Sequence, residues 1–240
     1  KAGKFCPYCG AAVKEQEEQS YYLPAGTRLN NERYVLGQAV NNGGFGIIYR
    51  AWDEVLQRVV AIKECYPASL VVRPIGSKSV VVNSSRAERY DEYQQILDDY
   101  VLEATIMSRF SKTKNICNVY EHFKENNTAY IVMEFLDGQD LKTYRRDNPN
   151  MTSEEKTEIM NQILEGVEAI HKEGVVHRDI SPDNIYICKD ENNKMMVKII
   201  DFGIASMDGK KRLKNRVVVK PGYTPPEQYI SAGTTGPWTD

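Results

Sequence analysis

Three polar residues in the second half of the chain most constrain its possible fold and chemistry: Asp179, Asn184 and Asp201. Asp179 closes the triplet His177-Arg178-Asp179, Asn184 follows five residues later, and Asp201 opens Asp201-Phe202-Gly203 after about one hairpin's length of sequence. Phosphoryl transfer requires such a set, because one carboxylate must lie near the attacking hydroxyl while an amide and a second carboxylate hold metal ions on the phosphates. The order and the gaps predict this chemistry more strongly than one triplet would.

Composition narrows the class of protein. At 240 residues the chain can bury a sizeable core, and a net charge of −2 gives no general attraction to nucleic acid or to an anionic membrane. No apolar run approaches the roughly 18 residues of a membrane span. The five cysteines are an odd number, and Cys65, Cys117 and Cys188 are scattered. This pattern favours a reducing, cytoplasmic location over a disulfide framework.

Two further motifs lie in a β-rich stretch nearer the N-terminus. Strands are expected at 34–40, 47–52 and 59–63. Gly43-Gly44-Phe45-Gly46 joins the first two, and missing side chains there would let the backbone lie over phosphates. Val60-Ala61-Ile62-Lys63 fills the third strand. Taken alone, the glycine motif fits an ordinary hairpin turn equally well.

With these motifs in this order, the chain resembles a eukaryotic-type protein kinase from about Tyr34 to Asp240. The long connection that begins Lys-Glu-x-x-Pro at Lys63 is similar to one found in a group of bacterial serine/threonine kinases. The resemblance implies an α+β, two-lobed fold: a β-rich N-lobe at 34–136 with one key helix, and a helical C-lobe at 137–240 that lacks its last helices. It also implies transfer of the γ-phosphate of ATP to Ser or Thr hydroxyls of protein substrates.

The resemblance assigns roles to the motif residues. Asp179 accepts or orients the proton of the substrate hydroxyl, and Asn184 and Asp201 ligate Mg²⁺. Lys63 binds the α- and β-phosphates and pairs with Glu103 on the following helix. His177 is expected to be structural rather than a base, and Asp240 is expected to brace the catalytic loop.

The adenine pocket is also implied by the resemblance. Met133 is the expected gatekeeper, and the backbone from Glu134 to Leu136 is the expected hinge. Asn41 stands where the family has its first glycine, and asparagine also tolerates left-handed backbone geometry. Without the resemblance, the apolar strand residues would be ordinary core. The expected nucleotide-contacting residues are Val40, Asn41, Gly43, Gly44, Phe45, Gly46, Ile48, Ala61, Lys63, Met133, Glu134, Leu136 and Tyr186.

Two positions depart from the family pattern in a paired way. Ser181 stands where serine/threonine kinases carry a lysine, and Lys220 stands where they carry the threonine that contacts it. We hypothesise that the two groups have exchanged places and that Lys220 supplies the catalytic positive charge. The alternative is a solvent-facing lysine and reduced activity.

The segment before Tyr223 is also unusual. No Ser, Thr or Tyr lies between Ser206 and Tyr223, so Arg178 has no obvious phosphorylated partner. We therefore expect activation by a partner, by dimerisation or by default. The basic run could attract an acidic partner, although such runs are usually solvated loops. It comprises Lys210, Lys211, Arg212, Lys214, Arg216 and Lys220.

The remaining sequence predicts the other elements. Residues 66–90 form an insertion, read as a loop with a short strand, and two paired strands are expected at 119–123 and 128–135. Apolar periodicity predicts a helix at 87–110. Helices are also expected at 140–146 and at 153–173, the second of which is entered through a capping sequence at Thr152.

The N-terminus carries a separate motif. Cys6-Pro7-Tyr8-Cys9-Gly10 resembles half of a zinc ribbon, in which two such knuckles give four thiolates to one Zn²⁺. We assign 1–13 to this knuckle, with Cys6 and Cys9 as possible zinc ligands, and 14–33 to a linker. Both ends are expected to be cut, with the first cysteine pair upstream.

Two other functions stay open on the sequence alone. A pseudokinase that binds nucleotide as a scaffold is favoured by Asn41 and Ser181, but opposed by the intact Lys63, Glu103, Asp179, Asn184 and Asp201. A small-molecule phosphotransferase of related fold is disfavoured by Pro225-Pro226-Glu227, which supports peptide docking in protein kinases.

Overall fold

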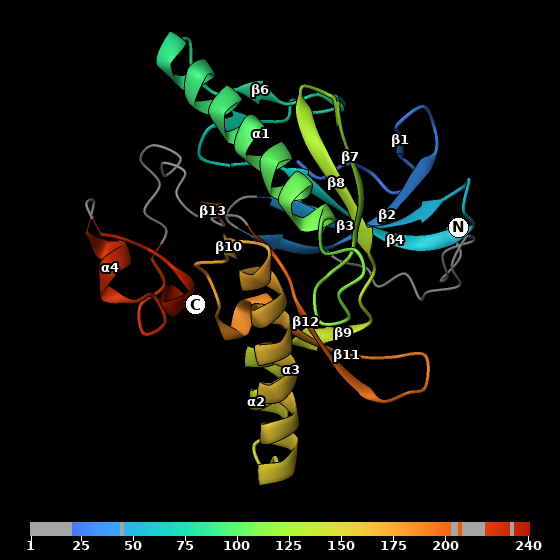
Figure 1. Ribbon diagram of the computed structural model, residues 1–240. Coiled ribbons are helices and arrows are strands. Elements are labelled where there is room, and N and C mark those ends of the chain that lie inside the picture. The colour runs from blue at the N-terminus through green and yellow to red at the C-terminus, as the bar shows by residue number, and fades with distance from the viewer. Residues whose placement is uncertain (1–20, 44–45, 203–205, 208–218, 231–232) are drawn as a thin grey trace. The chain divides into compact units, whose positions relative to one another are not determined.

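The computed structural model describes residues 21–43, 46–202, 206–207, 219–230 and 233–240 (Figure 1). The chain divides into two compact units. The first comprises Lys1–Ala104 and Val119–Phe135, and the second comprises Thr105–Asn118 and Leu136–Asp240. Each unit has its own core and is described separately below.

The first unit is built on a six-stranded antiparallel sheet with the order β1-β2-β3-β4-β8-β7. The strands expected from the sequence are confirmed, with β2 and β3 extended toward the glycine turn. β1 is a short strand within the stretch treated above as linker, and it pairs with the start of β2. The bounds are β1 Arg28–Leu29, β2 Tyr34–Gly43, β3 Gly46–Asp53, β4 Arg58–Cys65, β7 Val119–Glu125 and β8 Thr128–Glu134.

β4 is a central strand, flanked by β3 and β8. Six of its eight residues are buried, from Val60 to Cys65, which suits a strand covered on both faces. Lys63 lies opposite Ile48 in β3 and Ile131 in β8. The strand pairs on both sides therefore fix the backbone of Lys63 tightly.

The insertion folds into a small hairpin rather than a structureless loop. β5 (Val71–Val72) and β6 (Val81–Val82) pair antiparallel, so the expectation of a short strand there is confirmed. The β7–β8 turn holds the hairpin, because Val80 N–H donates to Asn126 O at 3.0 Å and Asn127 Nδ2 donates to Val80 O at 2.9 Å.

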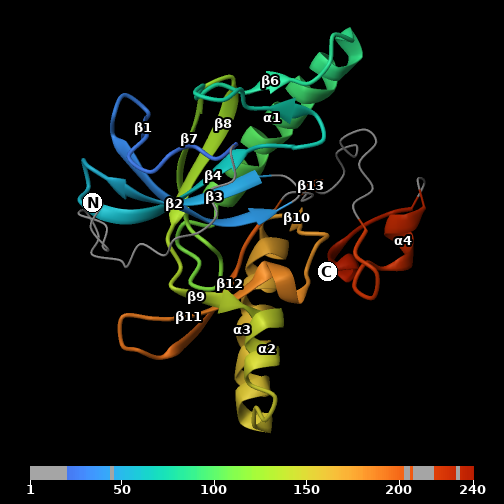
Figure 2. The same ribbon diagram turned by 180° about the vertical axis from the view of Figure 1, so that it is seen from behind.

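The predicted long helix is confirmed as α1, Ala87–Ser108, which lies beside β8 and β6 in both views (Figures 1 and 2). Its buried residues recur at three- and four-residue intervals, the pattern of one helix face. The same face carries Glu103, which is why a carboxylate becomes buried here. The apolar members of this face are Tyr93, Ile96, Leu97, Tyr100, Ala104 and Met107.

The second unit combines helices with a three-stranded sheet of order β12-β11-β9, and α3 packs against β12. The predicted helices and the hairpin between Asn184 and Asp201 are confirmed, and a capping box joins Thr152 and Glu155 at the start of α3. None of the helices in the described residues is long and apolar enough to cross a membrane. The bounds are β9 Gly138–Asp140, α2 Leu141–Asp147, α3 Ser153–Lys172, β10 Val175–Val176, η1 Pro182–Asn184, β11 Ile185–Lys189, β12 Met195–Ile199, β13 Ser206–Met207, α4 Pro226–Tyr229 and η2 Pro237–Thr239.

Candidate active site

In the first unit the structure joins Lys63 of β4 to Glu103 of α1, with Lys63 Nζ 3.3 Å from Glu103 Oε1. The two side chains are only 11% and 8% exposed. An ion pair this far from water keeps more of its attraction than a surface pair. The partner that the sequence analysis chose for Lys63 is thus the residue that the fold brings to it.

The other expected nucleotide residues of this unit lie on four strands, β2, β3, β4 and β8. Ala61 pairs with Met133, and Val60 pairs with Glu134. Ile48 is on β3, and Val40, half exposed, is on β2. Asn41 and Gly43 are in β2, while Gly44 and Phe45 lie outside the described residues.

Gly46 has a packing reason to be glycine. A Cβ at this position would collide with the carbonyl oxygen of Glu64 in β4. The strand pair β3–β4 therefore requires glycine at position 46 independently of any ligand.

In the second unit, Asn184 holds Asp179. Its amide Nδ2 donates to Asp179 Oδ2 at 2.7 Å and to Asp179 O at 2.9 Å. Asn184 sits at the end of η1, and its own carbonyl accepts from Ile200 N–H at 2.9 Å. This last bond brings Asp201, the next residue, to the same place. Asp179 and Asn184 are thus in contact, and Asp201 follows directly after a residue that is bonded to Asn184.

Two residues of this region have left-handed backbone conformations, with φ of 68° at Arg178 and 62° at Asp201. Such values are uncommon for residues other than glycine and cluster at functional sites. Phe202, fully buried, anchors the strained segment, with its ring 5.6 Å from that of Phe110 and 4.7 Å from that of His177. Packing therefore holds Asp201 in a conformation that its own preferences disfavour.

His177 is completely buried, and burial lowers its pKa despite the nearby carboxylates. Its Nδ1 accepts from the N–H of Asp179 at 3.2 Å, a geometry that requires Nδ1 to lack a proton. A neutral histidine that shapes the loop fits the structural role expected for it.

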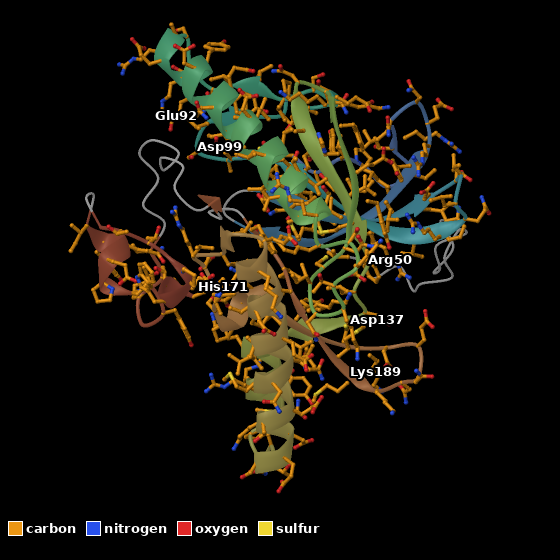
Figure 3. The ribbon with its side chains drawn as sticks, in the orientation of Figure 1. Arg50, Glu92, Asp99, Asp137, His171 and Lys189 are labelled. Carbon is orange, nitrogen blue, oxygen red and sulfur yellow. The ribbon has the colours of Figure 1, made fainter. Side chains whose placement is uncertain are left out.

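Asp240 braces this loop, as expected. Its carboxylate accepts from the backbone N–H of His177 at 2.8 Å and of Arg178 at 2.6 Å. His171 Nε2, on α3, lies 2.8 Å from the same carboxylate (Figure 3 labels His171). Charge-assisted bonds to backbone N–H groups are among the stronger hydrogen bonds of a protein.

Lys220 reaches the catalytic loop. Its Nζ donates to Ser181 Oγ at 2.6 Å and lies 3.4 Å from Asp179 Oδ1 and 3.5 Å from Asp183 Oδ2. Ser181 is 3% exposed and the side chain of Lys220 is 27% exposed, so this contact is partly buried. Thr224 Oγ1 accepts from the N–H of Lys220 and fixes the start of the lysine side chain. The geometry is the one that the exchange hypothesis requires.

Two other residues that were expected to contact the nucleotide, Leu136 and Tyr186, lie in the second unit. Leu136 opens the second unit, and Tyr186 is on β11, with its hydroxyl donating to Gly138 O at 2.9 Å. Cys6, Cys9 and the basic residues from Lys210 to Arg216 lie outside the described residues.

Sequence reasoning missed three contacts around this site. Thr235 accepts from Arg178 Nη2 at 2.6 Å, and Gln228 Nε2 donates to Arg178 O at 3.2 Å. Tyr100 donates to Lys63 O at 2.8 Å. A helical period marks Tyr100 as buried, but no sequence pattern gives the partner of a buried hydroxyl.

Comparisons with known proteins agree with this geometry. A probable serine/threonine-protein kinase of Clostridium acetobutylicum is 30% identical over 205 residues, which are 85% of this chain and 27% of that protein. Serine/threonine-protein kinase PknL of Mycobacterium tuberculosis is 28% identical over 226 residues, 91% of this chain and 50% of PknL. The chain thus spans only part of these relatives' length.

The chain is also similar to a solved structure and matches a protein family model. PpkA-294 in its apo form is similar with a TM-score of 0.77 and 34% identity, over 92% of this chain and 75% of that one. This likeness confirms the predicted α+β kinase-like fold. The family model of the protein kinase domain matches residues 34–240, which are most of the chain. The chain therefore belongs to the protein kinase family.

Proposed function

We propose that this chain is the catalytic part of an ATP-dependent kinase that phosphorylates Ser or Thr hydroxyls of proteins. The observation that carries the proposal is the bonding of Asp179 by Asn184, at 2.7 Å, inside a catalytic loop braced by Asp240. Membership of the protein kinase family and the serine/threonine kinases among its relatives support it.

In this proposal Asp179 receives or orients the proton of the substrate hydroxyl. A base must be held in place to do so, because small displacements of a reacting group cost much of the rate. Asn184 holds one oxygen of the carboxylate and Lys220 lies near the other. Lys63, held by Glu103, binds the nucleotide phosphates.

The oxygen donors of the second unit fit Mg²⁺. Both hydrogen bonds of the Asn184 amide run from its nitrogen to Asp179, so its oxygen is the atom suited to a cation. In this proposal Asp201 supplies a carboxylate as a second ligand, because magnesium prefers such oxygen ligands. When bound, Mg²⁺ would neutralise charge on the phosphates.

Lys220 supplies, in this proposal, the positive charge that a lysine at position 181 gives in other family members. We expect Lys220→Thr to reduce transfer about 100-fold, the order seen when one positioned donor is removed, while nucleotide binding persists. The double variant Ser181→Lys/Lys220→Thr restores the usual arrangement and should recover much of the loss.

Lys142→Thr is the matched control, because Lys142 Nζ lies 3.3 Å from Asp183 on an exposed surface. It also removes a lysine paired with Asp183. A Lys220→Thr enzyme as active as Lys142→Thr would contradict the role given to Lys220.

The deciding experiment measures transfer of labelled γ-phosphate from ATP with Mg²⁺ by the full-length protein and by its Asp179→Asn variant. Incorporation into protein acceptors that the variant loses would support the proposal. Binding of ATP without transfer by either protein would favour a nucleotide-binding scaffold. Labelling of small metabolites instead of proteins would favour a small-molecule phosphotransferase.

We further propose a regulatory partner or dimer, since the segment between Ser206 and Tyr223 offers no hydroxyl for activating phosphorylation. Cys65, Cys117 and Cys188 are buried and carry thiols rather than disulfides, which supports a cytoplasmic location. Cys6 and Cys9 would contribute half of a zinc site. Zinc analysis of the full-length protein, with Cys6→Ser/Cys9→Ser as the comparison, tests that last point.

A further inference from the structure

Tyr100 contacts the proposed phosphate-binding lysine from α1, one helical turn before Glu103. Its hydroxyl donates to Lys63 O at 2.8 Å, and the centre of its ring lies 5.5 Å from Lys63 Nζ. The residue is 6% exposed. We propose that Tyr100 is a positioning residue that fixes Lys63 in register with Glu103. This inference rests on the proposed kinase function.

The Lys63–Glu103 ion pair alone does not fix the spacing of β4 and α1. Both side chains are long and have several rotatable bonds, so their ion pair can persist while the backbones of β4 and α1 shift against each other. The Tyr100 hydroxyl instead bonds the main chain of Lys63 itself. Because the phenol of Tyr100 is rigid and contacts the backbone, it sets the distance between α1 and β4 at Lys63.

The ring contributes a second constraint. The face of an aromatic ring carries negative electrostatic potential and attracts an ammonium group within about 6 Å. Tyr100 and Glu103 lie three positions apart and so on the same helix face. Lys63 Nζ is thus drawn toward α1 at two successive points, one anionic and one neutral. The neutral contact persists if Glu103 is neutralised.

The same helix offers a matched control. Tyr93 lies two turns earlier on the same face, is 1% exposed, and donates from its hydroxyl to a backbone carbonyl, Asn127 O, at 2.8 Å. Tyr93→Phe and Tyr100→Phe each remove a buried hydroxyl that donates to a backbone carbonyl at the same distance, and the Tyr93 hydroxyl also shares a side-chain hydrogen bond with Thr128. The two variants differ in whether the lost partner is Lys63.

The test uses the full-length protein and measures kcat, KM for ATP, the dissociation constant of ATP and the urea unfolding midpoint. We expect the midpoint to fall for both variants, and at least as far for Tyr93→Phe, because the Tyr93 hydroxyl also has the hydrogen bond with Thr128. Tyr100→Phe should reduce kcat/KM about five- to tenfold and weaken ATP binding by a similar factor, the effect of roughly one hydrogen bond. Tyr93→Phe should change either quantity less than twofold.

A second background separates positioning from general packing. In Lys63→Met, adding Tyr100→Phe should cause no further loss of ATP affinity, because the tyrosine acts through the lysine. Equal kinetic and binding effects of Tyr93→Phe and Tyr100→Phe, or a full further loss in Lys63→Met, would overturn the inference. If the wild-type protein transfers no phosphate, the kinase proposal fails, and the ATP dissociation constants still decide the role of Tyr100.

Discussion

Two neighbouring residues of β4, Lys63 and Glu64, form ion pairs of different character. Successive side chains of a strand point to opposite faces, so the two pairs lie on opposite sides of the same sheet. Lys63 pairs with Glu103 of α1, and Glu64 pairs with Arg73 of the insertion.

The Glu64–Arg73 pair is enclosed and supported by many contacts. Its side chains are 0% and 2% exposed. Tyr130 and Tyr49 donate to the carboxylate of Glu64 at 2.9 and 3.1 Å. Arg73 also donates to two backbone carbonyls, Tyr21 O and Lys78 O. The pair thereby ties the segment before β1 and the insertion to the sheet.

The Lys63–Glu103 pair has a longer and less enclosed contact. Its 3.3 Å separation exceeds the roughly 2.7–2.9 Å of a tight charged hydrogen bond. The ammonium group of Lys63 has three donors, so it can donate to a phosphate oxygen while it keeps its contact with Glu103. The comparison teaches that one strand carries a pair suited to stability on one face and a pair suited to ligand exchange on the other.

The largest effect is expected from Arg73→Met. It removes the cation and leaves the buried Glu64 without its main partner, which typically costs about 3–5 kcal/mol of unfolding free energy. Urea unfolding measures the loss, and kcat per folded molecule should stay near that of the wild type. The control is Arg89→Met, since Arg89 and Glu92 form an exposed pair whose loss should cost about 0.5 kcal/mol or less. Equal losses for the two variants would mean that the burial of Glu64 has no energetic consequence.

Lys63→Met should show the reverse pattern. Transfer should fall about 10²–10³-fold, as when a positioned donor for developing charge is removed. Unfolding free energy should fall by only about 1.5–3 kcal/mol, the value of one hydrogen bond to a charged group. Steady-state kinetics and urea unfolding of the same preparation give both numbers. A stability loss as large as that of Arg73→Met would erase the distinction between the two faces.

Much of this site could be predicted from sequence because the motifs are local and ordered. Asp179, Asn184 and Asp201 are linked by short gaps and one hairpin, so their spacing nearly determines their meeting. Lys220 and Ser181 are 39 residues apart, yet their contact could be predicted because two unusual residues at paired positions explain each other.

The Glu64–Arg73 pair could not be predicted in this way. Arg73 lies in a stretch of mixed polarity with two prolines, where a single arginine usually faces solvent. Its burial depends on Tyr21, 52 residues away, and on the hairpin that turns it inward. Such a contact follows from three-dimensional packing, so no periodic pattern of residues in the sequence predicts it. Tyr100 is an intermediate case, because its burial follows from helical period but its partner does not.

The smallest predicted effect is a pH slope from Glu64. Burial raises the pKa of this carboxyl, and the opposing influence of Arg73, Tyr130 and Tyr49 does not cancel it. Above the usual glutamate pKa of about 4.3 the unfolded chain has released this proton while the folded chain still holds it. Folding then takes up a proton, so stability falls as pH rises toward the raised pKa, by at most about 1.4 kcal/mol per pH unit.

Glu64→Gln removes the titrating group and should flatten this part of the profile, measured as urea midpoints at increasing pH. Asp53→Asn is the control of opposite sign. Burial acts to raise the pKa of Asp53, but bonds from Arg33, Leu56 and Val55 outweigh it and lower the pKa. Asp53 therefore adds stability above its unfolded pKa that is lost as pH falls through the folded value. A profile that Glu64→Gln leaves unchanged would show that Arg73 keeps this carboxylate ionised, and the enclosed pair would then be a true ion pair throughout the pH range.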